Sequence, residues 1–467
     1  MSSNIATVVC GLFILALFLL ERDRNSRVSS ALWLPVVWLS LGASRSIAQW
    51  FGGVQAGEEI DQLVEGSPLD AAIFAGLMAT GLGILVARRR HARTFMRANG
   101  PLLLFFFYCA ASVLWSDYPF VAFKRWIKAV GDLVMVLVVL TDPEPISAAK
   151  RLLARTGFVL IPLSILLIKY YPHLGRSFSS WTGEAWNVGV ATQKNGLGLV
   201  CLIFGLGSCW YLLEALRGEG RPRTAGLVVA HGAILVMALW LFSMANSATS
   251  FGCFLLGAGL MVVTSMRTVA RTPAILHVLV GMLLLVVFYA IILNPAAGLT
   301  EIVGRNQTLT GRTDMWNQLY QMSDSPWFGV GYETFWKEPR LQEVWNRTNM
   351  HVHQAHNGYL EVFLNLGLVG VALLGVVMVW GYRNINHALR WDSEAGRIKL
   401  AYFVVAAIYS LTEHGFRERS PVWFIFLLAT MVIPQVGSHA PIEDQRDSDN
   451  ADSNSYEKEL DTSRHDQ

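Results

Sequence analysis

Charged residues are scarce in this chain. Only 15% of its 467 residues are Asp, Glu, Lys or Arg, whereas 53% are apolar and fall in long runs. This composition excludes an ordinary soluble domain and is typical of a protein that crosses a membrane several times. Cysteine is also scarce, and because each copy lies inside an apolar run, we expect neither a disulfide framework nor a CxxC metal site. The cysteines are Cys10, Cys109, Cys201, Cys209 and Cys253.

The apolar runs predict an all-α polytopic membrane protein with about 12 to 13 transmembrane helices. Helices are expected in residues 1–293 and in residues 359–435, separated by one long loop at 294–358. The first run has few leading charges and no small-residue cleavage site, so we expect a retained helix rather than a removed signal peptide. Residues 436–467 are rich in Asp, Ser, Glu and Asn, which predicts a disordered cytoplasmic tail.

The distribution of basic residues predicts which side of the membrane each loop faces. One set of alternate short loops contains 20 Lys and Arg residues, and the other set contains six. Basic loops tend to remain on the cytoplasmic side of a membrane. The 294–358 loop belongs to the other side, so we expect it to face outward.

The long loop is rich in aromatic residues, which are rare in disordered linkers. At about 65 residues it is far longer than most connections in compact folds, so we expect it to be functional. Thr313 to Met322 has helix-forming character, and Asp324-Ser-Pro326 should end that helix. The loop therefore predicts a folded, partly helical cap whose rings stack against sugars or lie in an interfacial belt. The aromatic residues are Trp316, Tyr320, Trp327, Phe328, Tyr332, Phe335, Trp336 and Trp345.

Three charged residues share one face of the apolar run at 120–140. Arg125, Lys128 and Asp132 are spaced at i, i+3 and i+7, and charges within a membrane span are candidates for function. A pair between Lys128 and Asp132 would leave Arg125 to bind an anion. Alternatively, the basic side chains only extend to the lipid headgroups. We predict that Arg125 and Lys128 contribute to substrate binding.

Two other segments contain candidate donors for an anion. Lys194 and Asn195 begin an apolar helix, so its positive end and its unpaired N–H groups would point outward. Arg312 lies in a polar part of the long loop, and a guanidinium can hold a diphosphate through two parallel hydrogen bonds. A flexible helix start and a solvated loop arginine are the simpler alternatives.

Histidines gather where the long loop meets the next apolar helix. His356 precedes Asn357, and Glu361 follows one turn into that helix. Histidine titrates near neutrality and can take a proton from a sugar hydroxyl, so His356 is the candidate base. His351 and His353 complete an HxHxxH spacing, but no fourth metal ligand accompanies them. We therefore expect no metal and no other cofactor.

Glu413 ends another apolar run, in the segment Thr412-Glu413-His414. Glu413 is expected at the outward edge of the membrane, at the same depth as His356. We predict that Glu413 positions His356 or an acceptor, although a pair with Arg417 at i+4 is equally compatible with the sequence.

Several short motifs resemble those of the O-antigen ligase and Wzy-type polymerase superfamily, above all its exopolysaccharide polymerase branch. They occur in order between residues 100 and 435. The resemblance implies a metal-independent, inverting glycosyltransferase of the GT-C type in the bacterial inner membrane, with the long periplasmic loop over the site. The motifs are Leu114-Trp-Ser-Asp117-Tyr-Pro, Lys194-Asn-Gly-Leu-Gly198, Ser247-Ala-Thr-Ser250, Gly311-Arg312-Thr-Asp-Met-Trp316, Trp327-Phe-Gly-Val-Gly331, His356-Asn-Gly-Tyr-Leu-Glu361 with Leu366-Gly-Leu-Val-Gly370, and Leu411-Thr-Glu413.

The resemblance also implies roles for individual residues. Arg312 would bind undecaprenyl diphosphate and His356 would serve the acceptor side, with Trp316, Asn357 and Glu361 among the substrate-binding residues of their motifs. Lipopolysaccharide ligases usually carry a Ser-Arg pair after the eighth helix, whereas the corresponding motif here has no cation. This difference disfavours a ligase and leaves Arg125, Lys128 or Lys194 to complete the anion site.

Three functions remain as hypotheses. The first is polymerisation of undecaprenyl-diphosphate-linked oligosaccharides into exopolysaccharide or O-antigen, the second is ligation of a finished glycan to a lipid or protein, and the third is saccharide export. A transporter would place its charges near the bilayer midplane, whereas the charges here collect at the outward edge. Besides the lipid-linked substrate and the bilayer, a chain-length regulator is a candidate partner, and no nucleic-acid partner is expected.

Overall fold

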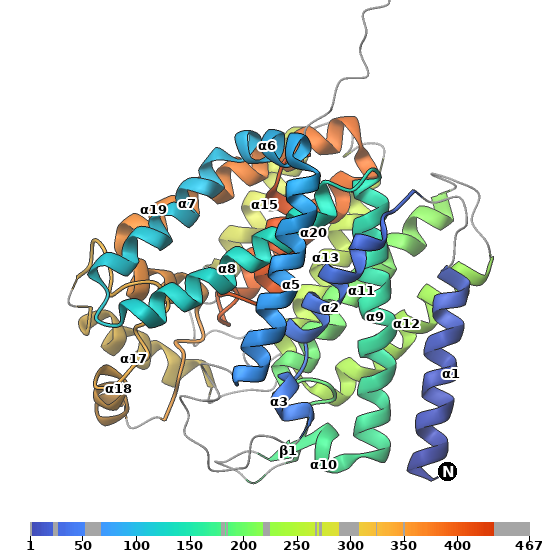
Figure 1. The fold of residues 1–467 in the computed structure, drawn as a ribbon, viewed down its shortest axis with the longest axis horizontal. Helices are drawn as coiled ribbons and strands as arrows, with labels where there is room; N and C mark the ends of the chain where they lie inside the picture. Colours follow the sequence, from blue (N-terminus) through green and yellow to red (C-terminus); the bar gives the residue numbers. More distant parts are fainter. Residues whose placement is uncertain are drawn as a thin grey trace, which may run out of the picture. The chain divides into compact units, whose positions relative to one another are not determined.

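The computed structural model describes residues 2–21, 27–51, 67–178, 183, 185–217, 225–266, 269, 273–288, 308–323, 325–348 and 351–433. The chain divides into two units, Met1–Val432 and Ile433–Gln467. The predicted tail at 436–467 lies outside the described residues, as does much of the first part of the long loop. The described residues are predominantly helical, which confirms the predicted all-α polytopic fold (Figure 1).

The structure contains long helices, short helical turns and one small β-ribbon. In chain order the helices are α1 (Ser3–Glu21), η1 (Ser30–Leu32), α2 (Trp33–Gly42), α3 (Ile47–Trp50), α5 (Pro68–Ala87), α6 (Arg89–Ala98), α7 (Gly100–Ala111), η2 (Ser112–Trp115), α8 (Pro119–Leu140), α9 (Pro145–Tyr170), α10 (Pro172–Gly175), α11 (Lys194–Arg217), α12 (Ala225–Ala245), α13 (Ala248–Thr264), α15 (Pro273–Phe288), α17 (Thr308–Gln321), α18 (Arg340–Thr348), α19 (Gly358–Trp391), α20 (Ser393–Tyr409) and α21 (Pro421–Thr430). The ribbon pairs β1 (Arg176–Phe178) with β2 (Ala185–Asn187) in antiparallel register.

Six of the described helices, α1, α5, α9, α11, α12 and α19, are long and apolar enough to cross a membrane. The bent pair of α6 with the segment from α7 through η2 would make a seventh, and four further apolar helices are shorter. The described residues therefore contain six or seven helices long enough to span, fewer than the expected 12 to 13, and the remaining apolar helices are shorter. Helix α8 does not qualify because Lys124, Arg125, Lys128 and Asp132 interrupt its apolar sequence.

Helices α20 and α21 are buried in the bundle. Every residue from Leu400 to Tyr409 is buried, as is every residue of α21. By contrast, α1 is apolar but largely exposed, with Val8 63% and Leu12 61% accessible. Apolar helices that are buried on all sides belong to a core, and exposed ones face lipid. The turn between α20 and α21, residues 410–420, therefore lies at one end of the buried helices.

A break in helix α19 fixes the position of the Trp327–Gly331 loop. Gly367 has φ 65°, which interrupts the helix, and the backbone N–H groups of Leu368 and Val369 donate to the carbonyls of Pro326 and Trp327 at 2.8 and 3.1 Å. A Cβ on Gly367 would lie 2.3 Å from the carbonyl of Trp327, so only glycine fits. The Trp327–Gly331 and Leu366–Gly370 motifs thus form one backbone contact.

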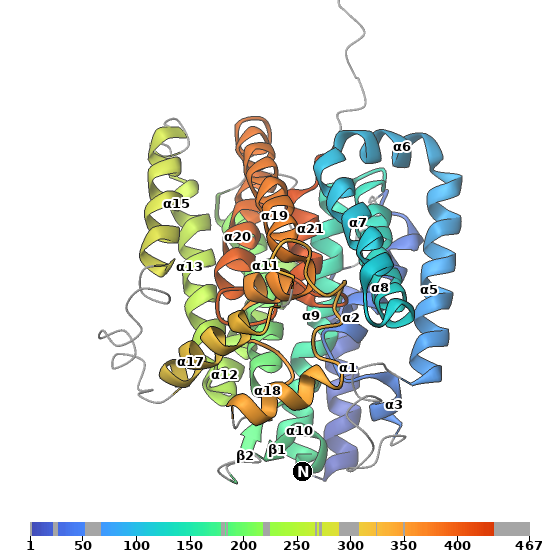
Figure 2. The ribbon, with the colours of Figure 1, turned by 90° about the vertical axis from the view of Figure 1, so that its left-hand side faces the viewer.

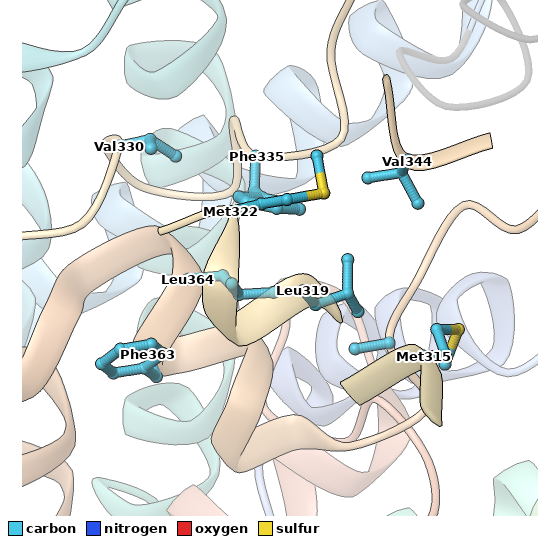
Figure 3. Close-up of a cluster of buried hydrophobic side chains, with 9 residues drawn as sticks. Met315, Leu319, Met322, Val330, Phe335, Val344, Phe363 and Leu364 are labelled. Carbon is cyan, nitrogen blue, oxygen red and sulfur yellow. The ribbon is translucent and has the colours of Figure 1, made fainter. Parts of the chain in front are cut away.

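The described part of the long loop folds into a small cap, defined here as residues 308–348. Helix α17 overlaps the predicted helix at Thr313 to Met322, and α18 follows it. In both ribbon views the two helices lie toward the end of the molecule opposite the arginine-rich α6 (Figures 1 and 2). The cap shares a buried apolar cluster with the start of α19, which Figure 3 shows. The cluster comprises Met315, Leu319, Met322, Val330, Phe335, Val344, Ala355, Phe363 and Leu364.

Candidate active site

Three side chains from distant segments meet at the carboxylate of Glu413, in the turn after α20. Nδ1 of His356 lies 3.2 Å from Oε2 of Glu413, and Nδ2 of Asn195 donates to Oε1 at 2.8 Å. Nη2 of Arg312 lies 3.8 Å from Oε1. The structure thus brings together four of the predicted site residues, and it selects contacts to His356 and Arg312 rather than a pair with Arg417.

The backbone next to His356 is tightly held. His356 has φ 51°, in the left-handed region, and such residues often mark functional sites. The side chain of Asn357 caps α19, because its oxygen accepts from the N–H groups of Tyr359 and Leu360 at 3.0 and 3.2 Å. The N–H of Gly358 donates to the carbonyl of Ser410 at 2.7 Å. These bonds fix the start of α19 against the turn that carries Glu413.

The ring of His356 can act as a base in this arrangement. When Nδ1–H donates to Glu413, the carboxylate orients the imidazole and Nε2 remains as the atom that accepts a proton. The side chain of His356 is 25% exposed and that of Glu413 is 11% exposed. A substrate hydroxyl can therefore approach the ring, while the carboxylate behind it is largely shielded from water.

Arg312 approaches the same carboxylate from α17. Its Nη1 donates to the carbonyl of Thr412 at 2.9 Å, and its side chain is 25% exposed. Glu413 balances the charge of Arg312, and the partial exposure leaves room for other contacts. A diphosphate could form charge-assisted hydrogen bonds with this guanidinium.

Close packing of α11 against α13 positions Asn195, in the first turn of α11, beside Glu413. Oγ of Ser247 donates to Oδ1 of Asn195 at 3.3 Å and lies 3.1 Å from Oγ of Ser250, within hydrogen-bond distance. A Cβ on Gly198 would lie 2.7 Å from Ser247 Cβ and 2.7 Å from Ser250 Oγ, so glycine allows α11 and α13 to approach. Helix α11 begins at Lys194 as predicted, and Nζ of Lys194 lies 4.6 Å from the ring centre of Trp186.

A buried ionic group lies beside the Glu413 contacts. Nε2 of His414 is 3.4 Å from Glu333, and Nδ1 is 3.9 Å from Glu361. Burial alone would lower the pKa of His414, but the carboxylates of Glu361 and Glu333 outweigh it, so the net shift is upward. Burial alone would raise the pKa of Glu333, but the interaction with His414 and the charges of Arg125 and Arg417 together outweigh it, so the net shift is downward. The folded state thus favours the charged pair of His414 and Glu333.

Several predicted substrate-binding residues are engaged within the protein. Glu361 is 1% exposed and accepts hydrogen bonds from Trp336 at 2.8 Å and from the N–H of Ala355 at 2.5 Å. Trp316 donates to the carbonyl of Ala355 at 2.7 Å. Glu361 and Trp316 therefore hold the residue before His356. Their predicted contact with substrate stays a prediction, as does that of Asn357.

Arg125 and Lys128 lie on α8, outside the group around Glu413. Arg125 donates to the carbonyl of Glu333. The carboxylate of Asp132 accepts from Nε1 of Trp38 and from the backbone N–H of Arg419, both at 2.7 Å. Asp132 thus stabilises the 410–420 turn, and the expected pair with Lys128 is not among its hydrogen bonds.

Glu333 and His414 were not assigned from the sequence. His414 was visible only as the neighbour of Glu413, and Glu333 lies 81 positions earlier in the sequence, with φ 57°. No spacing rule connects these two residues, because they meet only when the cap packs on the 410–420 turn. Ser247 and Ser250 lay within a recognised motif but had no predicted role.

The remaining loop histidines contact an aromatic ring. His351 and His353 lie with their ring centres 4.9 and 5.2 Å from that of Trp345. Burial, followed by the charge of His351, lowers the pKa of His353. Within the described ranges, no group of three His, Cys, Asp or Glu side chains is arranged to hold a metal ion.

Comparison with known proteins identifies similar sequences. Residues 199–375 match a family model described as O-antigen ligase, a segment that includes Arg312 and His356 but not Glu413. The chain is 24% identical over 295 residues to the "Exopolysaccharide production protein ExoQ" of Rhizobium meliloti (strain 1021), which covers 60% of this chain. The match spans 64% of the length of that relative. The resemblance indicated by the motifs is thereby confirmed, and the chain is a multi-pass membrane protein with similarity to the O-antigen ligase family over residues 199–375 and to ExoQ over 295 residues.

Proposed function

We propose that the chain is a glycosyltransferase that polymerises undecaprenyl-diphosphate-linked oligosaccharide repeat units on the periplasmic side of the inner membrane. The observation that carries this proposal is the meeting of Arg312, His356 and Glu413 at the end of the buried helices. A cation can stabilise a departing diphosphate, and an oriented imidazole can accept a proton. In this proposed role, Arg312 acts on the donor and His356 acts on the acceptor of the same transfer reaction.

In the proposed reaction a hydroxyl of one saccharide attacks the anomeric carbon of another. The hydroxyl proton passes to Nε2 of His356 as the new C–O bond forms. The bond between the anomeric carbon and the diphosphate oxygen breaks, and the lipid diphosphate leaves with its charge stabilised by Arg312. A single displacement of this kind inverts the anomeric configuration.

The charge arrangement supports a reaction that needs no metal. A guanidinium within about 4 Å of a phosphate oxygen contributes roughly 4 kcal/mol at an effective dielectric of 20, before desolvation. Purified protein supplied with lipid-linked repeat units should therefore remain active in excess chelator. Activity that disappears with chelator and returns with a divalent cation would contradict this part of the proposal.

The sidedness of the proposal is supported by the basic residues. Helix α6 carries Arg89, Arg90, Arg93 and Arg97, and it lies at the end of the molecule away from α17 and α18 (Figure 2). The preference for basic residues on the cytoplasmic side would place the cap in the periplasm. A chain-length regulator that contacts the growing polymer would meet the protein on that same side.

Ligation of a finished glycan is the second candidate, because the matched domain is described as O-antigen ligase. The two functions leave different substrates behind when the protein is absent. In a deletion strain, single lipid-linked repeat units should accumulate if the protein is a polymerase. Accumulated long lipid-linked chains would instead indicate a ligase.

The two proposed roles can be separated with point variants. His356→Ala should lower polymer formation by about 10²- to 10⁴-fold, the usual contribution of a positioned base, while donor binding is retained. Arg312→Lys should weaken donor binding although it keeps the charge, because lysine lacks the planar fork. Donor binding and turnover would be measured on both variants, with Arg347→Lys on exposed α18 as the matched control. A His356→Ala protein that loses donor binding but keeps turnover at saturating donor would contradict the acceptor-side role.

A further inference from the structure

An exposed apolar surface lies where the cap meets α7, η2 and α19. Phe328 is 52% exposed, and its ring centre lies 6.0 Å from that of Trp115, which is 38% exposed. Next to these rings, Leu114, Trp327 and Leu368 are 88%, 65% and 44% exposed. We call these five residues the cap rim. Large apolar side chains gathered on one surface mark a place of interaction with another partner.

The cap rim continues the exposed apolar faces of two helices. On α19, Leu368, Val376 and Val379 are exposed, and their spacing places them on one side of the helix. On α7, Leu104 and Phe107 are exposed and lie one turn apart. The two helices lie side by side (Figure 1), and both belong to candidate spans. Exposed apolar faces of spans contact lipid, so the rim is continuous with a lipid-facing surface.

The lengths of the same two helices place the rim within the bilayer. The 14 residues from Leu368 to Tyr382, which precedes Arg383, rise about 21 Å in a helix. The segment Gly100–Trp115, which follows the arginine-rich α6, rises about 26 Å. The hydrocarbon layer is about 30 Å thick, and a tilted helix rises less than its length. Measured from their basic ends, both helices therefore bring the rim to a point inside this layer.

The backbone at the break in α19 is paired as a position within lipid requires. The carbonyls of Leu364 and Asn365 accept from two N–H groups of the Trp327–Gly331 loop at 3.3 and 2.9 Å. The carbonyl of Leu366 accepts from the hydroxyl of Tyr108 on α7 at 2.9 Å, and the first two N–H groups after the break donate to cap carbonyls. Irregular backbone is tolerated at membrane depth only where protein or a water-filled cavity satisfies its polar groups. These three carbonyls and two N–H groups all have protein partners and need no water.

A charged pair marks the edge of the rim. Asp117, two positions after Trp115, accepts from Nη2 of Arg340 at 3.0 Å, and the side chain of Asp117 is 62% exposed. Charged side chains avoid hydrocarbon, so this pair belongs at the level of the headgroups. Trp115 then lies at the boundary between headgroups and acyl chains, where indole rings are enriched.

We propose that the cap rim is a membrane-binding surface, inserted into the leaflet on the cap side, with lipid acyl chains as its partner. The inference stands apart from the proposed reaction, because exposure, helix length and backbone pairing carry it. The first segment of α19 joins the rim to His356. Insertion of the rim therefore also sets the height of the candidate site above the lipid.

Spin labels report the surroundings of the rim directly. The full chain would carry Leu114→Cys or Phe328→Cys, labelled with a nitroxide and reconstituted into phosphatidylcholine vesicles at a low ratio of protein to lipid. Each label should collide more often with oxygen, which concentrates in hydrocarbon, than with a water-soluble nickel chelate. Glu343→Cys on α18 is the matched control and should show the opposite ratio, because its side chain is half exposed beyond the rim. Unsubstituted protein treated with the same label gives the contribution of the native cysteines.

Each other outcome has a defined meaning. Chelate collisions at Phe328→Cys as frequent as at Glu343→Cys would place the cap loop in water and overturn the inference, whatever the result at Leu114→Cys. Labels shielded from both reagents would show that protein covers the rim, and spin–spin broadening that disappears on dilution with unlabelled chain would identify a second copy. Either result would overturn the lipid assignment. A chain without transferase activity whose labels lie in hydrocarbon would contradict the proposed function and support the rim.

Discussion

Glu413 is the residue that connects the parts of the candidate site. Its carboxylate is approached by Arg312 from α17, by His356 from the start of α19 and by Asn195 from α11. Each partner depends on the negative charge or on the acceptor oxygens of the carboxylate. A change at this one position should therefore disturb the cation and the base together.

Glu413→Gln should lower turnover by about 10²-fold, because an uncharged amide neither pairs with Arg312 nor stabilises a protonated His356. The protein should still reach the membrane, since the substitution preserves size and leaves an oxygen for Asn195. Polymer formed per amount of membrane protein provides the measurement. Glu343→Gln is the control, because Glu343 is half exposed on α18. Turnover in Glu413→Gln equal to that of the control would remove Glu413 from the site.

His414 should make stability depend on pH. Its pKa is raised in the folded protein, where the carboxylates of Glu361 and Glu333 outweigh burial and the opposing charge of Arg417. The stabilisation is therefore complete below the ordinary histidine value of 6.5 and is lost as pH rises through the raised pKa. The melting temperature of the wild-type protein in detergent should decline as pH rises through this range. His414→Gln should remove this decline. The exposed variant His173→Gln should retain the decline, and a wild-type protein without it would contradict the charged pair.

At the scale of elements, the cap depends on a small apolar core rather than on its helices alone. Helices of the length of α17 and α18 are marginal by themselves, so tertiary packing has to stabilise them. Phe335 is fully buried at the centre of this packing and contacts Trp336 edge to face. The backbone contact between the Trp327–Gly331 loop and the break in α19 fixes the other end of the cap.

Phe335→Ala should loosen the cap by about 3 to 5 kcal/mol, the usual effect of removing a buried phenyl ring. Because only the start of α19 among the candidate spans shares this cluster, we expect faster proteolysis within residues 308–348 while the spans remain intact. Limited proteolysis followed by mass mapping measures the effect. Trp327→Ala is the control, since the Trp327 side chain is 65% exposed. Equal cleavage rates in the two variants would show that the cluster does not hold the cap.

At the scale of the whole molecule, the distribution of charge relates the fold to the membrane. The arginine-rich α6 and the cap lie toward opposite ends of the described structure (Figures 1 and 2). Lys150 pairs with Glu214 at 2.7 Å, joining α9 to α11, and these two helices are among the six candidate spans. The arginine-rich helix α6 thus lies away from the cap (Figure 2).

Sidedness can be tested with single cysteines. A membrane-impermeant maleimide applied to spheroplasts should label Glu343→Cys on α18, because we expect the cap to be periplasmic. Arg93→Cys on α6 should be labelled only after permeabilisation. The native cysteines are buried or partly buried in the bundle and give the background. Labelling of Arg93→Cys but not Glu343→Cys in sealed spheroplasts would reverse the orientation.

Hydrophobic length and local spacing are properties of adjacent residues, and these features could be predicted from the sequence. The all-α membrane fold, the start of α11 at Lys194 and a helix at Thr313 to Met322, which overlaps the observed α17, all follow from apolar runs and local propensity. The expected number of spans was less well determined, because α8 combines apolar length with four charges. The composition of α8 indicates that this helix is unusual, but it does not determine how the helix packs.

Only the tertiary structure decided which charged residues meet. From the sequence, Glu413 could pair with Arg417 one turn away or with His356, 57 positions earlier; the packing of the cap and α19 on the 410–420 turn selected His356 and Arg312. The same packing paired Glu333 with His414 and directed Asp132 to Trp38 and Arg419. These contacts depend on segments that are close in space but distant along the chain, so no local periodicity encodes them.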